Sequence, residues 1–179
     1  MRSLTILGLS VIFVAEAALA CEEEQKGLEV VIERVDRVGR LLEVWARVVN
    51  RGQVPVILEK TARGDAWVLH SLKVEQRERA GRWISVGPIG DQPPKSVIEL
   101  KPGQSLSTMV PLVDPFPFPK KGNPVRIRGP LRAKLPYFAT EEEWRAYRAA
   151  VNLAVRTMGK LPKDPPVAVS EPFEIPPNK

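Results

Sequence analysis

The chain of 179 residues contains a single cysteine, Cys21, and a single histidine, His70. One cysteine cannot form a disulfide within the chain. Metal sites combine histidines with cysteines or carboxylates at close spacing, and His70 has no such neighbours, so neither a metal nor a cofactor is expected. Glycine-rich phosphate loops and a G-x-S-x-G nucleophile motif are also absent. These absences favour a protein without catalytic residues.

His70 is expected on an apolar strand face. The stretch 66–77 places it at the same parity as Val68, Leu72 and Val74. This position favours a buried, hydrogen-bonded histidine over a ligand or a general base. A Ser-His-Asp site remains open, because its members need not be neighbours in sequence.

Acidic clusters are also scarce. Carboxylates are grouped only at 22–24 and 141–143, which suit a tether and a helix start and do not suggest a glycosidase pair. The net charge is +6, but no basic run exceeds the pair Lys120-Lys121. Dispersed positive charge is typical of solvated strand faces, so no nucleic-acid partner is expected.

The first twenty residues have the three parts of a secretory signal peptide. Arg2 supplies positive charge, Leu4 to Val14 is an uncharged apolar stretch too short to span a bilayer, and Ala18-Leu19-Ala20 fits the small-residue cleavage rule. Residues 1–20 are therefore predicted to be a signal peptide and the mature chain to be exported.

Cleavage after Ala20 would make Cys21 the first mature residue. This arrangement resembles the bacterial lipoprotein signal, in which the cysteine thiol carries a diacylglycerol. Ala18 and Leu19 depart from the usual residues, so ordinary cleavage that leaves a terminal cysteine is the alternative. The resemblance implies lipidation at Cys21, membrane attachment through this N-terminal lipid, and a location in the cell envelope, on its periplasmic or outer face. Residues 21–27 would form the tether.

The body of the chain, residues 28–179, is expected to be one β-rich domain. With 18 prolines the chain cannot be mostly helical. Leu41 to Asn50 alternates strictly, since Leu42, Val44, Ala46 and Val48 share one face. Further strands are predicted at 28–35, 54–59, 66–77, 82–86, 97–100, 104–112, 125–134 and 167–175. Their number and spacing favour an all-β antiparallel sandwich of immunoglobulin-like type.

Two stretches carry a resemblance to a known fold. "ARVVNRGQVPVIL" at 46–58 and "ELKPGQSLS" at 99–107 resemble the immunoglobulin-like domains of exported bacterial proteins and of a proteinase-inhibitor family with that fold. The resemblance covers about residues 28 to 112, and it implies a fold rather than an activity.

One α-helix is predicted as an insertion at about 140–159, between the last two strands. Thr140 and Glu143 form a capping box, and Gly159 ends the helix. The apolar residues Trp144, Tyr147, Val151, Val155 and Met158 fall on one face, which is expected to cover the sandwich.

Three features could bind a partner. Phe116 and Phe118 alternate with prolines, although a rigid loop packed on the domain is the simpler interpretation. Arg126 and Arg128, with Arg132 and Lys134, could form a basic stripe along one strand that faces membrane headgroups, with a solvent-facing role as the alternative. Trp45 lies on the polar face of its strand and could belong to an exposed aromatic patch.

The sequence thus favours a non-catalytic binding or assembly module at the cell envelope, whose partner is a protein or an envelope polymer. A proteinase inhibitor that uses the exposed loop 87–96 is the alternative. A periplasmic hydrolase that uses His70 is a third hypothesis.

Overall fold

The computed structural model describes residues 27–60, 69–87, 94, 96–115 and 126–176. The predicted leader, Cys21 and the tether up to residue 26 lie outside these ranges, as do Phe116, Phe118 and most of the loop 87–96. The hypotheses attached to these residues therefore stay predictions.

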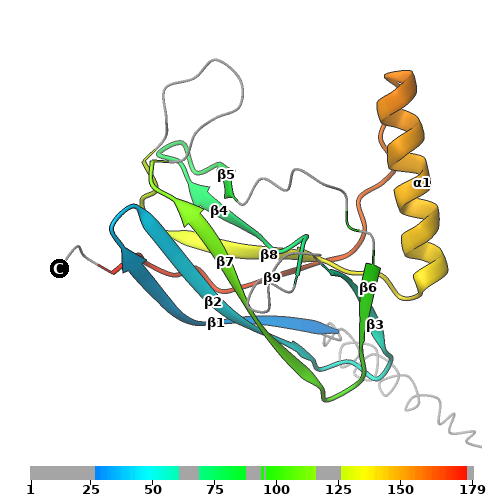
Figure 1. Cartoon of the computed structure of the whole chain (residues 1–179), viewed down its shortest axis with the longest axis horizontal. Coiled ribbons are helices and arrows are strands. Elements are labelled where there is room, and N and C mark those ends of the chain that lie inside the picture. The colour runs from blue at the N-terminus through cyan, green and yellow to red at the C-terminus, as the bar shows by residue number, and fades with distance from the viewer. Residues whose placement is uncertain (1–26, 61–68, 88–93, 95, 116–125, 177–179) are drawn as a thin grey trace, which may run out of the picture.

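The described residues form nine β-strands and one α-helix (Figure 1). In chain order they are β1 (Leu28–Val38), β2 (Leu41–Asn50), β3 (Val56–Lys60), β4 (Lys73–Arg77), β5 (Trp83–Gly87), β6 (Ser96–Leu100), β7 (Ser105–Val113), β8 (Leu131–Pro136), α1 (Glu141–Thr157) and β9 (Val167–Val169). The fold is mostly β, and the helix is inserted between β8 and β9, as the sequence predicts.

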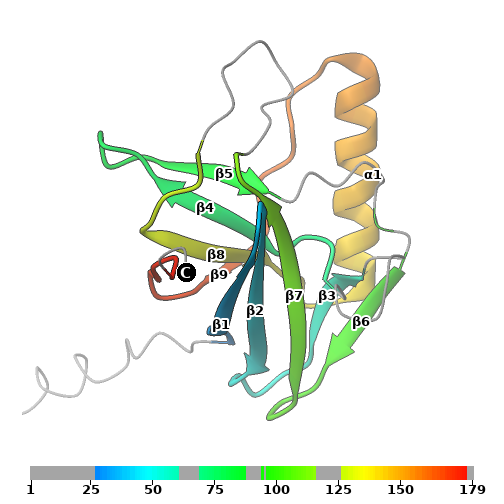
Figure 2. The ribbon, with the colours of Figure 1, turned by 60° about the vertical axis from the view of Figure 1, so that its left-hand side comes forward.

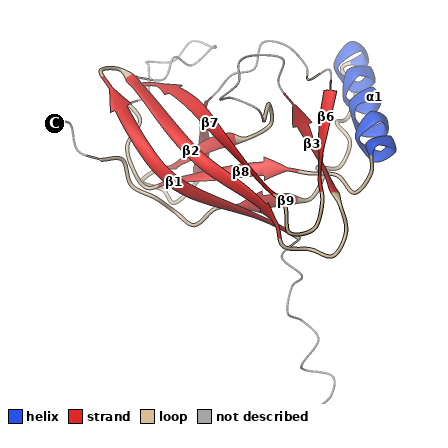
Figure 3. Ribbon diagram, turned by 60° about the horizontal axis from the view of Figure 1, so that its bottom comes forward, coloured by secondary structure: helices blue, strands red, loops and turns tan. Residues whose placement is uncertain are grey.

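The described strands form three antiparallel sheets, with the orders β1-β2-β7, β3-β6 and β5-β4-β8-β9. The first and the last enclose a common hydrophobic core, in which Val44 and Val110 belong to the same buried cluster as Val74 and Leu135. Figure 3 shows β1, β2 and β7 side by side, with β8 and β9 in a separate layer. Each of these sheets therefore has one core face and one outer face.

Strand β2 follows the predicted alternation. Leu42, Val44, Ala46 and Val48 are all fully buried, because alternate residues of a strand leave on opposite faces. Its neighbour β1 departs from strict alternation, since the register with β2 shifts between Ile32 and Arg34. A bulge of this kind inserts one unpaired residue and reverses the face of those that follow.

Three strands are shorter than predicted. β4 begins only at Lys73, because Ser71 and Leu72 are buried in succession and break the alternation. β8 begins at Leu131, after the Gly129-Pro130 break. β9 ends at Val169, and beyond it only Phe173 bridges back to Leu131.

The two stretches that carry the immunoglobulin-like resemblance contact each other through Asn50. This fully buried side chain donates from Nδ2 to the carbonyl oxygens of Val54 and Leu100, both at 2.8 Å, and accepts at Oδ1 from the Gly52 amide at 2.9 Å. Its backbone carbonyl accepts from the amide of Gly103, the turn residue with φ +76°. Asn50 therefore joins the ends of β2 and β6 to the turn that follows β6.

Helix α1 starts at its predicted cap, but its left-handed C-terminal residue is Met158 (φ +51°), one position before the predicted Gly159. Thr140 accepts from the Glu143 amide at 3.1 Å, while the Glu143 carboxylate accepts from the Ala139 amide at 2.9 Å. The helix stands beside β3 and β6 at one end of the molecule (Figures 1 and 2). There Trp144 packs with Ile57 and Phe138.

The predicted apolar stripe of α1 is wrong in its second half. Val155 is 67% exposed and Met158 is 95% exposed, whereas Ala154 is buried. In Figure 1 the far part of the helix extends beyond the described sheets, so none of the described strands covers it. Helical periodicity predicts the face of a residue but does not predict where the neighbouring sheet ends.

Candidate functional site

A pocket of about 350 Å³ lies on the outer face of the sheet β5-β4-β8-β9, beside α1. Its size lies within the range of small-molecule sites. Strands β4, β5 and β8, helix α1 and the segment before β9 all contribute to its walls. The described lining residues are Glu59, His70, Ser71, Lys73, Glu75, Ser85, Lys134, Pro136, Phe138, Tyr147, Arg148, Asp164, Pro165 and Val167.

The register of β4 and β8 brings two lysines together in this pocket. Lys73 pairs directly with Lys134 across the strands, and neither has an ion-pair partner among the described residues. Two positions along, Glu75 pairs with Arg132, whose guanidinium is 2.7 Å from the carboxylate. Like charges placed opposite each other destabilise a sheet. The pocket therefore contains a locally uncompensated positive charge next to a compensated pair.

The pocket also contains an unsatisfied donor. Ser71 is 4% exposed, and its hydroxyl is buried without a hydrogen-bond partner among the described residues. Buried polar groups are nearly always hydrogen-bonded, and one that is not requires a reason. A ligand acceptor in the pocket would satisfy this hydroxyl.

The helix side of the pocket is held by Glu59. Its side chain is 6% exposed, and it accepts a hydrogen bond from Trp144 Nε1 at 3.0 Å and has Arg148 at 3.7 Å. Glu59 thus fixes the Trp144 end of α1 against β3 and orients Arg148 on the pocket wall. Arg148 compensates the Glu59 charge, and the neutral Trp144 indole adds a hydrogen bond.

Tyr147 provides a neutral donor on the same wall. Burial, and then the carboxylates of Asp164 and Glu59, raise the pKa of Tyr147 above its ordinary value of 10.0, while Arg148 opposes the shift. The phenol therefore keeps its proton at neutral pH. Its ring packs against Phe138 with centroids 5.4 Å apart, which gives the pocket an apolar surface beside its polar groups.

The charges of this pocket suit one anionic group. Glu59 and Glu75 are compensated, which leaves Lys73, Lys134 and Asp164 as the charged lining groups without an ion-pair partner among the described residues. An anion can bind between the lysines, whereas a second negative charge would approach Asp164. Phe138, Pro136 and Val167 would contact an apolar part of the ligand.

The predicted burial of His70 is wrong. The side chain is only half-buried and lines the pocket next to Ser71, while its backbone amide donates to the Glu59 carbonyl at 2.9 Å. It precedes β4 rather than lying within a strand, so the parity argument does not apply to it. The Ser71 hydroxyl makes no hydrogen bond, so this arrangement lacks the nucleophile–base contact of a serine hydrolase.

The four residues of the possible basic stripe do not lie along one strand. Arg126 and Arg128 precede β8 and line a separate cleft. Arg132 pairs with Glu75 and lies 4.3 Å from the Trp83 ring centroid, and Lys134 lines the helix-side pocket. The Gly129-Pro130 break separates the first two residues from the others.

Trp45 lies on the outer face of the other sheet and does not approach any of these residues. The guanidinium of Arg34 covers its ring at 4.3 Å from the centroid, and its Nε1 is buried without a partner. The loop 87–96 of the inhibitor hypothesis is described only at Gly87, Pro94 and Ser96, so that hypothesis stays a prediction.

Sequence reasoning missed Lys73, Ser71, Tyr147 and Asp164 as site residues, and it named Lys134 only as part of the possible basic stripe. They come from four separate segments, and no motif links them. The only local signal was Lys134, which alternates with buried residues of β8 and therefore points away from the core. It became informative only once Lys73 was known to be its cross-strand partner.

No known protein family, curated protein or solved structure matches the chain. In the described ranges, no helix combines the length and apolar composition of a membrane span. The same ranges contain no group of three or more histidine, cysteine, aspartate or glutamate side chains arranged to hold a metal ion.

Proposed function

We propose that this protein is an exported, lipid-anchored, non-catalytic binding protein of a bacterial cell envelope. The observation that supports binding is the pocket beside α1, where two opposed lysines and an unsatisfied serine hydroxyl face the same space. The support for export and anchoring is the leader pattern that ends at Cys21. The ligand class is a small organic anion with an apolar part.

The body that carries this pocket is proposed to be an immunoglobulin-like sandwich. Two antiparallel sheets around one core and the strand-joining role of Asn50 support this assignment. The helix insertion between β8 and β9 supplies the wall that a plain sandwich lacks, which is where individual function is often located.

Hydrolysis is the second candidate, because His70 and Ser71 line the same pocket. Binding is preferred because the Ser71 hydroxyl has no hydrogen-bond partner, so no base activates it in this arrangement. A hydrolase would cleave p-nitrophenyl acetate at a rate well above background, and His70→Ala would abolish that activity without unfolding the protein. The binding proposal predicts the background rate for both proteins.

Three probes of the same size test the ligand class. Benzoate, benzyl alcohol and benzylammonium differ mainly in charge, and NMR chemical-shift titration detects binding at millimolar affinity. Benzoate should shift amides of β4, β8 and α1, and the other two should not. The Lys134→Met variant should lose most of the benzoate response, whereas Lys101→Met, which removes an exposed turn lysine, should keep it. Preferential binding of benzylammonium would refute the anion assignment.

The Ser71→Ala variant tests the contribution of the serine hydroxyl to binding separately from that of the lysine charges. Removing an unsatisfied buried hydroxyl leaves the free protein at least as stable, but it should weaken benzoate binding several-fold. An unchanged affinity would show that the hydroxyl does not contact the ligand.

Intact mass spectrometry of the membrane-extracted protein tests the anchor. The wild-type chain should lack residues 1–20 and carry acyl chains, and Cys21→Ala should carry none. A mature wild-type mass without acyl chains would refute lipid anchoring and leave the pocket proposal unaffected.

A further inference from the structure

A second cleft, of about 860 Å³, lies at the opposite end of β4 from the helix-side pocket and is rich in arginine. Its described lining residues are Gln76, Arg77, Glu78, Arg79, Ala80, Arg126, Arg128 and Gly129. Arg77, Arg79, Arg126 and Arg128 are all exposed and have no ion-pair partner among the described residues. We name this feature the arginine cleft.

The backbone under the arginine cleft is held firmly. The Ile127 amide donates to Asp114 Oδ1 at 3.0 Å, and the Arg128 amide donates to Gln76 Oε1 at 2.6 Å. Asp114 is in turn paired with Arg37 at 2.9 Å. Arg126 and Arg128 therefore extend from a segment that the amides of Ile127 and Arg128 anchor to Asp114 and Gln76.

The acidic groups near the cleft do not neutralise it. Glu78 is paired with Arg82 at 3.0 Å, which leaves little of its charge for the cleft. Glu174 lies against Gly129 at one edge. Four guanidinium groups thus face one uncompensated carboxylate, and guanidinium forks match phosphate oxygens in a bidentate geometry.

We propose that the arginine cleft binds a chain of linked phosphate groups. The cleft is too large for one phosphate ion, since its volume falls in the range of sites for larger ligands. Its four cations come from two segments, 77–79 and 126–128, so neighbouring phosphates of one chain could engage both. No aromatic side chain is among the described lining residues, which disfavours nucleic acid, because single strands bind largely by base stacking.

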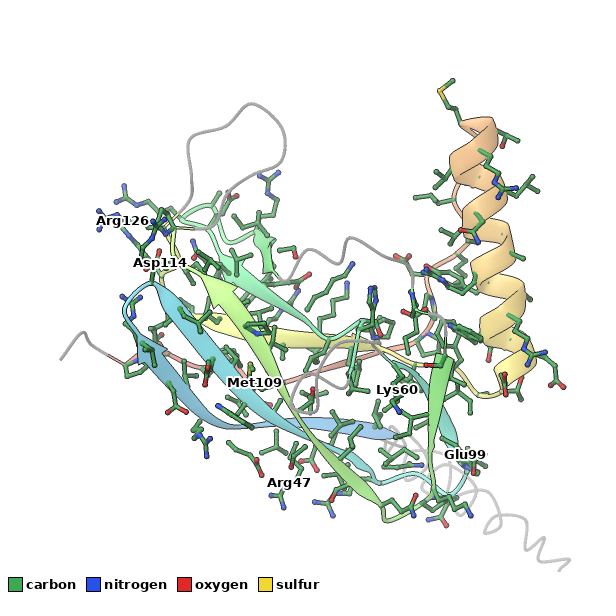
Figure 4. The ribbon with its side chains drawn as sticks, in the orientation of Figure 1. Arg47, Lys60, Glu99, Met109, Asp114 and Arg126 are labelled. Carbon is green, nitrogen blue, oxygen red and sulfur yellow. The ribbon has the colours of Figure 1, made fainter. Side chains whose placement is uncertain are left out.

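The position of the cleft favours a soluble chain over the headgroups of the anchoring membrane. β1 has 11 residues, so at about 3.3 Å per residue its ends lie about 33 Å apart. Asp114 is bonded through its amide to Arg40, just past the far end of β1, and Figure 4 shows Asp114 and Arg126 together at that end. The predicted tether joins β1 at Leu28, the other end. The choice of a soluble phosphate chain over membrane headgroups rests on the proposed function, because it assumes the N-terminal anchor. Anion binding in the cleft does not depend on that function.

Calorimetric titration with tripolyphosphate tests the proposal on the full mature protein in non-ionic detergent. Tripolyphosphate should bind with an affinity that falls as salt increases, because binding releases counterions. The double variant Arg126→Ala/Arg128→Ala should lose about ten-fold or more in affinity, since two charge-assisted contacts are removed. Arg47→Ala removes a charge on the other sheet, visible in Figure 4, and should leave the affinity unchanged.

Two further variants sharpen the test. Arg126→Lys/Arg128→Lys keeps the charge but loses the bidentate fork, so its affinity should fall between wild type and the alanine pair. Glu174→Gln should strengthen binding. Lys134→Met should leave tripolyphosphate binding intact even where it abolishes benzoate binding, so the two sites can fail independently.

The source of the phosphate is distinguished by ligand choice. Inorganic phosphate and glycerophosphoglycerol, a lipid headgroup, should bind much more weakly than tripolyphosphate. Equal binding of glycerophosphoglycerol would overturn the choice of a linked chain in favour of a headgroup. Tighter binding of a thymidine oligonucleotide with three phosphates would overturn it in favour of nucleic acid. Equal affinities of the alanine pair and Arg47→Ala would refute the site itself.

Discussion

Replacing Lys134 by methionine should make the unliganded protein more stable and the liganded protein less stable than wild type. In the free protein Lys134 lies directly opposite Lys73 in the β4–β8 register, with no acidic partner among the described residues. Opposed residues of this kind have Cβ atoms about 5 Å apart, and long side chains can spread to about 7 Å. Coulomb repulsion between two unit charges at that distance in water is about 0.6 kcal/mol.

The gain expected from Lys134→Met is therefore small, about 0.5 kcal/mol. Methionine keeps the apolar stem of the lysine at this position, opposite Val169 of β9, so little packing is lost. Lys73→Glu should raise the free energy of unfolding by more, about 1 kcal/mol, because it replaces the repulsion with a cross-strand ion pair. Both gains should shrink at high salt, since exposed charges are screened.

Bound ligand should reverse the order of stability of Lys134→Met and wild type. Benzoate at 100 times its dissociation constant should stabilise wild type by about 2.7 kcal/mol and leave Lys134→Met nearly unaffected. Urea unfolding followed by the fluorescence of the four tryptophans measures both quantities, with sodium chloride at equal ionic strength as the salt control. Lys101→Met is the matched variant and should follow wild type in both conditions.

Two results would refute this reasoning. If Lys134→Met were less stable than Lys101→Met without ligand, the lysine pair would be structural rather than strained. If benzoate stabilised Lys134→Met as much as wild type, the pocket would not bind the anion through this charge.

Three further predictions concern the residues that hold the pocket and the fold. Asn50→Ala should lower the free energy of urea unfolding by about 2–4 kcal/mol, because the buried carbonyl oxygen of Leu100 and the part-buried one of Val54 lose their donor. Trp144→Phe should lower the free energy of unfolding by about 1.5–3 kcal/mol, because the Glu59 carboxylate is buried and loses a hydrogen-bond donor. When Glu59 is already replaced by glutamine, no buried charge loses a donor, and the same substitution should lower it much less. The pKa of Tyr147 is raised in the folded state, so above about pH 10 the unfolded state loses this proton first. The free energy of unfolding of the wild type should therefore fall as the pH rises through this range. In Tyr147→Phe this fall should be smaller.

Features that depend on neighbours in sequence were predictable. The alternation in β2 and the capping of α1 by Thr140 and Glu143 involve residues two or three positions apart, whose relative directions follow from strand and helix geometry alone. The strand-joining asparagine was visible as a motif, although its bonds to Leu100 and Gly103 were not.

Features that depend on pairing across the chain were decided only by the tertiary structure. Lys73 and Lys134 are far apart in the sequence, and only the antiparallel register makes them neighbours. Arg77 and Arg128 are also distant in sequence, and they line one cleft because the Arg128 amide is bonded to Gln76. The exposure of the end of α1 likewise depends on where β3 and β6 stop. A one-residue change of register would move every side chain of a strand to the other face, so which charges share each candidate site follows from the pairing of distant segments, even where a local pattern such as Arg126 and Arg128 is visible in the sequence.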